Sequence, residues 1–226
     1  MPQISGCRHQ GPAAVSDVMP DRIFTIGHST HSQERLVHLL KIHDVTALCD
    51  VRSTPFSRMN PQFDRDVLEK ALRLQNIEYR FLGKELGART EDPKCYQDGR
   101  VRYDRLAETE LFKHGIQRVL RGVKEGFRIA LMCAEKEPLE CHRTILVARY
   151  LAAPGLEVEH ILADGHLERH DAALARLCRM LNVPERHMFC SHEELLADAY
   201  RRQGDRIAYD ASRLVDETVV NEGDAK

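Results

Sequence analysis

Short apolar runs of strand type alternate along this chain with longer stretches of helical periodicity, and no other sequence feature constrains its fold as strongly. Repeated strand-helix-strand units predict a mainly parallel sheet, because right-handed crossovers connect parallel strands. The most apolar run, residues 127–133, is typical of a strand buried on both faces. We therefore predict one α/β domain with a doubly wound, Rossmann-like sheet of about five strands and helices on both faces. The expected strands are residues 22–26, 45–51, 78–82, 127–133 and 158–162, and the expected helices are residues 36–42, 64–74, 106–124, 141–151 and 167–181.

The two ends of the chain differ in composition from its middle. Residues 1–20 are rich in Gly, Pro, Ala and Ser, which predicts a flexible N-terminal tail. The α/β domain is expected over residues 21–182. Residues 183–226 are expected to form a helical or loose C-terminal extension with a polar, acidic end. A chain of 226 residues is long enough for one sizeable core, so no second domain is required.

Charge and cysteine usage limit the classes of partner and compartment. The net charge of −2 provides no overall field for a polyanion, so nucleic acid would need a local basic patch. The seven cysteines are scattered, with no Cys-x-x-Cys pair, which suits a reducing compartment. The sequence shows neither a signal-peptide core nor an apolar run long enough to cross a bilayer. We expect a cytoplasmic protein without a membrane partner.

Polar residues follow the ends of the predicted strands. Ligands of such sheets bind beyond the carboxyl ends of the strands, so these residues are expected to meet at one edge. A purely structural turn asks only for Gly, Pro, Asn or Asp, and the ends here carry more chemistry than that. The sequence therefore predicts a functional site. The strand ends are Gly27-His28-Ser29, Asp50-Val51-Arg52-Ser53, Gly83-Lys84-Glu85, Cys133-Ala134-Glu135 and Asp164-Gly165-His166.

The richest of these segments joins the fourth predicted strand to the helix predicted over residues 141–151. That helix opens with a thiol, an imidazole and a guanidinium in succession. Free N–H groups and the helix dipole favour anions there and lower the pKa of a thiol in the first turn, so Cys141 is predicted to be partly thiolate. The candidate catalytic residues are Cys133, Glu135, Cys141 and His28, and the candidate ligand-binding residues are Ser29, Asp50, Arg52, Ser53, Arg58, His142 and Arg143.

A metal site is an alternative to these roles. Cys133, Cys141, His142 and His28 are of the types that ligate zinc, but the usual ligand spacings are missing. Buried cysteines also serve as small apolar residues. The sequence therefore assigns no metal ligands and implies no cofactor.

Taken together, the strand-end motifs resemble those of the domain of unknown function 488 family. The resemblance covers roughly residues 22–174 and implies a bacterial-type cytosolic single domain with the same strand-end residues as its signature. It implies no reaction. The motifs that carry it are Thr25-Ile26-Gly27-His28-Ser29, Asp50-Val51-Arg52, Pro55 with Ser57-Arg58, Tyr79 to Leu86, and Cys133-x-Glu135 with Cys141-His142-Arg143.

The leading functional hypothesis is an enzyme of hydrolase or transferase type that acts on a phosphate-bearing ligand, a nucleotide or a nucleic-acid base. Arg52, Arg143 and the helix start at Cys141 would hold the anion, and Glu135 or His28 would act as general acid or base. The first alternative is a non-catalytic nucleotide or nucleic-acid binding module. The second is a thiol redox or metal-binding protein, with a Cys133–Cys141 disulfide. The binding module would use the arginines of the predicted loops, Arg52, Arg58, Arg89, Arg100, Arg102 and Arg105.

Overall fold

The computed structural model describes residues 21–152, 156–184 and 188–212. The tail predicted over residues 1–20 and the acidic end from residue 216 lie outside the described residues. The strands are β1 (Asp21–Gly27), β2 (Ala47–Asp50), β3 (Glu78–Phe81), β4 (Tyr96–Gln97), β5 (Arg100–Val101), β6 (Ile129–Cys133), β7 (Leu156–Ile161) and β8 (Leu167–Arg169). The α-helices are α1 (Gln33–Lys41), α2 (Arg65–Arg73), α3 (Gly83–Leu86), α4 (Tyr103–Ala107), α5 (Glu110–Lys124), α6 (Arg149–Leu151), α7 (His170–Met180) and α8 (His192–Ile207), and the other helical turns are η1 (Pro61–Phe63), η2 (Pro93–Cys95), η3 (Pro138–Glu140) and η4 (Arg143–Ala148).

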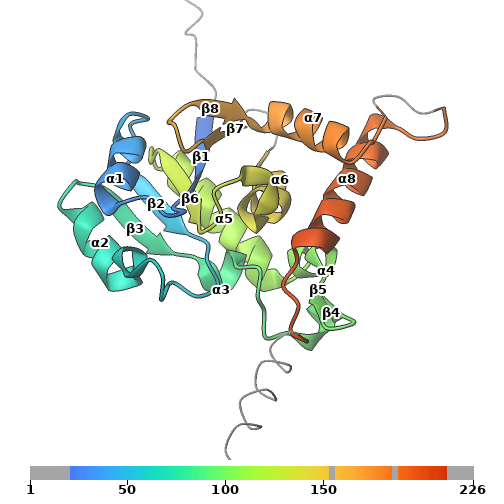
Figure 1. The fold of residues 1–226 in the computed structure, drawn as a ribbon, viewed down its shortest axis with the longest axis horizontal. Helices are drawn as coiled ribbons and strands as arrows, with labels where there is room; N and C mark the ends of the chain where they lie inside the picture. Colours follow the sequence, from blue (N-terminus) through green and yellow to red (C-terminus); the bar gives the residue numbers. More distant parts are fainter. Residues whose placement is uncertain (1–20, 153–155, 185–187, 213–226) are drawn as a thin grey trace, which may run out of the picture.

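A six-stranded sheet in the order β3-β2-β6-β1-β7-β8 forms the centre of the fold (Figure 1). Its first five strands run parallel, which confirms the predicted α/β fold with a mainly parallel sheet. Strand β6 lies between β1 and β2, and Gly27 at the end of β1 is in register with Cys133 at the end of β6. The carboxyl ends of β1, β2 and β6 therefore meet at one edge.

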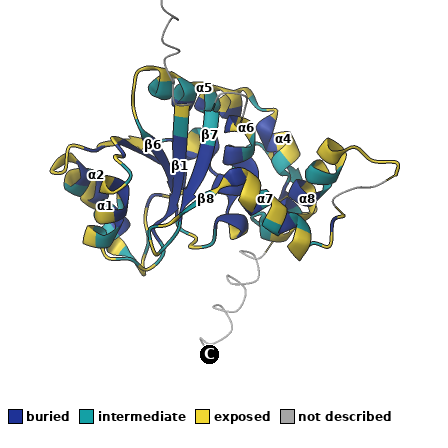
Figure 2. Cartoon of the chain, turned by 90° about the horizontal axis from the view of Figure 1, so that it is seen from above, coloured by how far each residue is buried: buried dark blue, intermediate teal, exposed yellow. Residues whose placement is uncertain are grey.

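Helices cover both faces of the sheet (Figure 2). Because neighbouring strand residues point to opposite faces, β1 contributes Phe24 and Ile26 to the core beneath α1 and α2, and Ile23 to the core beneath α5 and α6. Strand β6 is buried along its whole length, as the apolar run predicted. None of the helices in the described part of the chain has the length and apolar character needed to cross a bilayer.

Three local predictions were wrong. The sixth strand, β8, occupies the start of the helix predicted over residues 167–181, because a turn with Gly165 at φ 102° reverses the chain and pairs β8 antiparallel with β7. The segment 83–104, which lies between β3 and that part of the chain where the next helix was predicted, contains α3, η2 and the β4-β5 hairpin. The helix predicted over residues 106–124 is two helices, α4 and α5. The one predicted over residues 141–151 is the π-helical segment η4 followed by α6.

The C-terminal extension packs against the α/β domain. Helix α8 begins with a capping box, in which Ser191 and Glu194 each bond to the other's backbone N–H. Its apolar face packs together with α7 in a separate cluster of buried apolar residues. Beyond α8, the Val101 N–H donates to the Tyr209 carbonyl, which ties the extension to the β4-β5 hairpin. The extension thus reaches the strand-end edge of the sheet.

Two buried histidines link this extension to the sheet. Thr25 Oγ1 lies 2.8 Å from His160 Nδ1, His160 Nε2 lies 3.1 Å from His170 Nδ1, and His170 Nε2 lies 2.8 Å from the Tyr200 hydroxyl. Burial lowers the pKa of His170 to about 4, and burial, then the neighbouring His170, lowers that of His160 well below its usual value. Both rings are therefore neutral in the folded protein near neutral pH.

Acidification is expected to destabilise the fold through these histidines. The folded pKa of His170, about 4, lies below the unfolded value of about 6.5, so the unfolded chain binds the extra proton between these pH values. The free energy of unfolding should fall by about 1 kcal/mol for His170 alone between about pH 7 and pH 5.5. Urea unfolding at both pH values measures it. His170→Gln should flatten this slope, and His166→Gln, at an exposed position, should not.

Candidate active site

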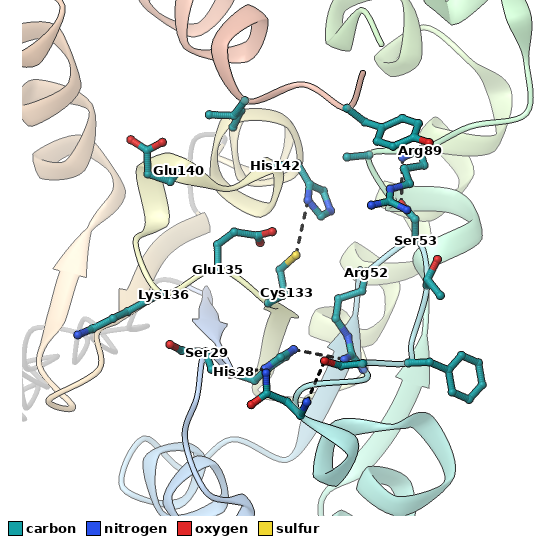
Figure 3. Close-up of a pocket in the computed structure, with 18 of the residues that line it drawn as sticks. His28, Ser29, Arg52, Ser53, Arg89, Cys133, Glu135, Lys136, Glu140 and His142 are labelled. Carbon is teal, nitrogen blue, oxygen red and sulfur yellow. Dashed lines mark hydrogen bonds between the residues drawn. The ribbon is translucent and has the colours of Figure 1, made fainter. Parts of the chain in front are cut away.

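A cavity of about 750 Å³ opens at the carboxyl ends of β1, β2 and β6 (Figure 3). His28 from the end of β1, Arg52 from the end of β2 and Cys133 from the end of β6 line it, and His142 joins them from the turn before η4. These residues lie far apart in the sequence but point toward a common space. Three of the five strand ends predicted to converge thus meet at this cavity, whereas Gly83-Lys84-Glu85 and Asp164-Gly165-His166 do not line it.

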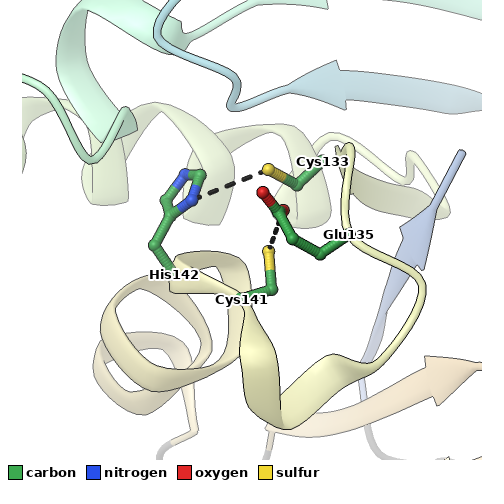
Figure 4. A group of neighbouring side chains, drawn as sticks. All are labelled: Cys133, Glu135, Cys141 and His142. Atoms are coloured by element: carbon green, nitrogen blue, oxygen red, sulfur yellow. Dashed lines mark hydrogen bonds between the residues drawn. The ribbon is translucent and has the colours of Figure 1, made fainter. Parts of the chain in front are cut away.

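A cluster of two thiols, a carboxylate and an imidazole forms the floor of this cavity (Figure 4). Cys133 Sγ lies 3.6 Å from His142 Nδ1, and Cys141 Sγ lies 2.9 Å from Glu135 Oε2. One donor atom from each of the four residues lies within 4.8 Å of every other. Both cysteines and His142 are buried, whereas Glu135 is exposed on its outer side. Cys133, Glu135 and His142 face the cavity, and Cys141 lies beneath them.

The tautomer of His142 follows from its surroundings. Its Nε2 lies 2.9 Å from the Val51 carbonyl oxygen, which can only accept, so Nε2 carries a proton and donates. The other nitrogen, Nδ1, then presents its lone pair to Cys133 when the ring is neutral. The imidazole is thus oriented by the main chain after β2 to receive a proton from a thiol or to bind a metal ion.

The pKa values of the two buried thiols are shifted in opposite directions. Burial acts to raise the pKa of Cys141, but the hydrogen bond from Cys133 and the charges of Arg143 and His142 hold it well below its usual value. Burial, and then Cys141 and Glu135, raises the pKa of Cys133 well above the usual value. Burial and the neighbouring Cys141 also raise the pKa of Glu135. The pKa of Cys141 is thus lowered by neighbouring side chains rather than by the α-helix start on which the prediction rested, because this segment opens with a π-helical turn.

Arg143 does not take the ligand-binding position predicted for it. Its side chain is fully buried, and its guanidinium donates to the carbonyl oxygens of Glu135, at 2.6 Å, and Lys136, at 3.3 Å. The wide π-helical turn of η4 begins at this residue. Gly27 makes the arrangement possible, because a Cβ there would lie 1.9 Å from the Glu135 carbonyl oxygen. Arg143 therefore holds the loop that carries Glu135 and supplies positive charge beneath Cys141.

Asp50 and Arg52 form a buried ion pair at the end of β2. The Asp50 carboxylate accepts from Arg52 Nε at 2.9 Å and Nη2 at 2.6 Å, and from the Tyr79 hydroxyl at 2.8 Å. Arg52 Nη2 also donates to the Phe63 carbonyl oxygen. Asp50 does not line the cavity but orients the Arg52 side chain. One edge of the Arg52 side chain faces the cavity.

His28 lines the cavity, and hydrogen bonds occupy its imidazole ring. Arg52 Nη1 lies 3.3 Å from His28 Nε2, and His28 Nδ1 lies 2.9 Å from the Ser29 carbonyl oxygen. Both ring nitrogens are therefore engaged, and the ring packs against Phe63. Burial, only partly offset by the Ser29 carbonyl, lowers the pKa of His28 to about 4, so the ring is neutral and accepts from Arg52.

The arginines of the predicted nucleic-acid footprint do not form one basic surface. Arg58 is exposed and does not line the cavity, although its neighbours Phe56, Ser57 and Asn60 do. Arg100 pairs with Asp210 and Arg102 with Asp205, and Arg105 donates to the main-chain carbonyls of Lys94 and Tyr96. Of these loop arginines, Arg52 and Arg89 line the cavity.

Comparison with known proteins settles the family. A family model described as domain of unknown function DUF488 matches residues 32–151, more than half of the chain. The chain belongs to the DUF488 family. This confirms the resemblance inferred from the strand-end motifs. No curated protein and no solved structure matches the chain.

The DUF488 match contains most of the site, from Asp50 and Arg52 to the four residues of the cavity floor. His28 and Ser29, at the end of β1, lie just before it. Ser29 and Ser53, which the sequence proposed as ligand-binding residues, line the cavity.

Several residues of the cavity wall escaped prediction from the sequence. Lys136 follows Glu135 directly and could have been inferred from its place at a strand end. Ile207 and Tyr209 come from the end of the C-terminal extension and gave no local signal. The C-terminal extension, which lies beyond the DUF488 match, thus completes the wall of the cavity.

Proposed function

We propose that this DUF488 protein is an enzyme of hydrolase or transferase type that acts on a phosphate-bearing, nucleotide-like ligand. The observation that carries the proposal is the cluster of Cys133, Glu135 and His142 at the floor of an open cavity whose walls bear hydroxyls, aromatic rings and cations. Reactive groups at the bottom of a cavity large enough for a small molecule are typical of an active site.

The walls offer groups suited to each part of such a ligand. Arg89 lies over the Tyr209 ring, with its guanidinium carbon 4.3 Å from the ring centroid, and both face the cavity. Together with Lys136 they supply a flat stacking surface and positive charge for a base and a phosphate. Uncharged polar side chains suited to sugar hydroxyls also face the cavity, namely Ser29, Thr30, Ser53, Thr54, Ser57 and Asn60.

Glu135 is assigned the role of general acid or base. Its carboxylate borders the cavity and the Cys141 thiol at once, so it can exchange a proton with a ligand bound above the cluster. The six cysteines that the structure describes are free thiols, which supports a reducing, cytoplasmic compartment for this chemistry. The engaged loop arginines argue against a broad nucleic-acid groove.

Turnover of a nucleotide panel tests the proposal. The full chain is incubated with nucleosides, nucleoside mono- and triphosphates and short single-stranded oligonucleotides, and products are identified by mass spectrometry. Conversion of at least one phosphate-bearing compound is expected. Binding without conversion would favour a binding module instead, and the absence of both would refute a nucleotide-like ligand.

Arg89→Ala is expected to weaken nucleotide binding. A charge-assisted hydrogen bond is worth about 1.5–3 kcal/mol, so the dissociation constant of a bound nucleotide should rise about tenfold or more, as measured by calorimetry. Its control is Arg121→Ala, an exposed arginine of α5 that does not line this cavity. An equal affinity for the two variants would place the phosphate elsewhere.

A further inference from the structure

We propose that Cys133, Cys141 and His142 hold a zinc ion, with the Glu135 carboxylate beside its open coordination position. The inference deepens the proposed function, on which its catalytic part rests, and it develops the metal-binding alternative, for which the sequence assigned no ligands. The sequence spacing concealed the site, because the two cysteines are eight positions apart and the histidine directly follows the second.

The separations between donor atoms suit a shared tetrahedral metal ion. Zinc binds sulfur at about 2.3 Å and imidazole nitrogen at about 2.0–2.1 Å, which places the two donors about 3.5 Å apart in tetrahedral geometry. Cys133 Sγ and His142 Nδ1 lie 3.6 Å apart. Cys141 Sγ belongs to the same group of donor atoms within 4.8 Å of one another. Thiolate and imidazole donors together select zinc over magnesium or calcium.

The groups around the cluster orient its side chains so that they can act as metal ligands. The Val51 carbonyl accepts the proton of His142 Nε2, so the lone pair of Nδ1 is directed at the sulfurs. Metal-bound histidines usually make such a second hydrogen bond. The Arg143 backbone N–H donates to Cys141 Sγ at 3.4 Å, and its guanidinium lies in the buried layer beneath, where it offsets part of the negative charge of two thiolates and a carboxylate.

The fourth position of this ion would open into the cavity. Cys133, His142 and Glu135 all face the cavity, so a water molecule or ligand can approach from that side. Three protein ligands and an open position are the usual arrangement of a catalytic zinc. Two thiolates, one imidazole and a nearby glutamate that is not a ligand form the donor set with which zinc deaminases activate water on a nucleobase.

The chemistry that follows is hydrolytic. Zinc-bound water gives a proton to Glu135, and the resulting hydroxide adds to an electrophilic carbon of the ligand. Glu135 returns the proton to the leaving group, whose bond to that carbon breaks with both electrons. Water is consumed, no electrons are exchanged, and both cysteines remain unmodified.

Metal binding can be tested without any substrate. The full-length protein, reduced and stripped of metal, is titrated with Zn²⁺ in competition with a chromophoric chelator, and with Co²⁺ under absorption spectroscopy. We expect about one ion per chain, sulfur-to-cobalt charge-transfer absorption, and loss of two reactive thiols on Zn²⁺ binding. Cys133→Ser and Cys141→Ser should each weaken Zn²⁺ binding by more than about 100-fold, beyond the 10–100-fold cost of removing an outer-shell partner.

Two variants serve as controls. Cys190→Ser, at an exposed cysteine outside the site, should bind Zn²⁺ as the natural chain does, and Glu135→Gln should retain affinity within about tenfold. Unchanged affinity in both Cys133→Ser and Cys141→Ser would overturn the proposal. Absence of thiol protection or of the charge-transfer band in the unmutated protein would overturn it too, whether or not the variants fold.

The outcomes separate this inference from the proposed function. Zinc bound through the two thiolates in a protein that converts no nucleotide would leave the metal site standing and refute the activity. Nucleotide conversion by protein that binds no zinc would refute the metal site and leave Cys133 as the candidate nucleophile beside His142.

Discussion

Asp50→Asn is expected to lower the free energy of unfolding by about 3–5 kcal/mol, the cost of leaving a buried charge without its partner. Asp50 is fully buried, and its carboxylate accepts from the Arg52 guanidinium, the Arg52 backbone N–H and the Tyr79 hydroxyl. An asparagine of the same shape keeps at most part of these hydrogen bonds and leaves the Arg52 charge uncompensated. Urea unfolding followed by circular dichroism measures the loss.

Two matched substitutions show whether the charge is responsible. Tyr79→Phe removes one hydrogen bond to the same carboxylate and should cost about 1 kcal/mol. Asp164→Asn changes an exposed aspartate at another strand end and should stay within about 0.5 kcal/mol of the natural chain. If Asp50→Asn proved no more harmful than Tyr79→Phe, the ion pair would not be the element that fixes Arg52 against the cavity.

Glu135→Gln is expected to reduce turnover of the nucleotide-like substrate by about 10²- to 10⁴-fold, the usual contribution of a general acid or base. The amide preserves the size of the side chain but cannot shuttle a proton between the cluster and a ligand. The affinity for the ligand and the thermal stability should change little, because the carboxylate is exposed on its outer side. Single-turnover kinetics with whichever nucleotide is converted measure the effect.

The control for this experiment is Glu125→Gln, which makes the same change at the exposed end of α5, away from the cavity. It should retain full turnover. A Glu135→Gln protein with natural turnover would remove Glu135 from the mechanism, while a protein that also lost its ligand affinity would assign the carboxylate to binding instead. The ratio of kcat to KM effects thus separates the two roles.

His28, at the end of β1, illustrates which features of the site could be predicted from the sequence. His28 was correctly placed at the same edge as Cys133, since the carboxyl ends of parallel strands must meet there. Its role could not be read from the sequence, because that depends on Arg52, which contacts it from the end of β2. The same holds for Arg143, whose position in a motif with Cys141 and His142 suggested ligand contact but whose guanidinium points into the core.

The sequence by itself determined the α/β class, the parallel sheet and the strand ends that carry Cys133 and Glu135, because strand period, apolar runs and turn residues are local properties. Only the tertiary structure decided which side chains face the cavity. The pairing of β8, the inward turn of Arg143 and the wall formed by Tyr209 each depend on contacts between segments distant in sequence. Side-chain direction there is set by packing and by the demand that buried polar groups find partners, and neither is encoded in the residues on either side.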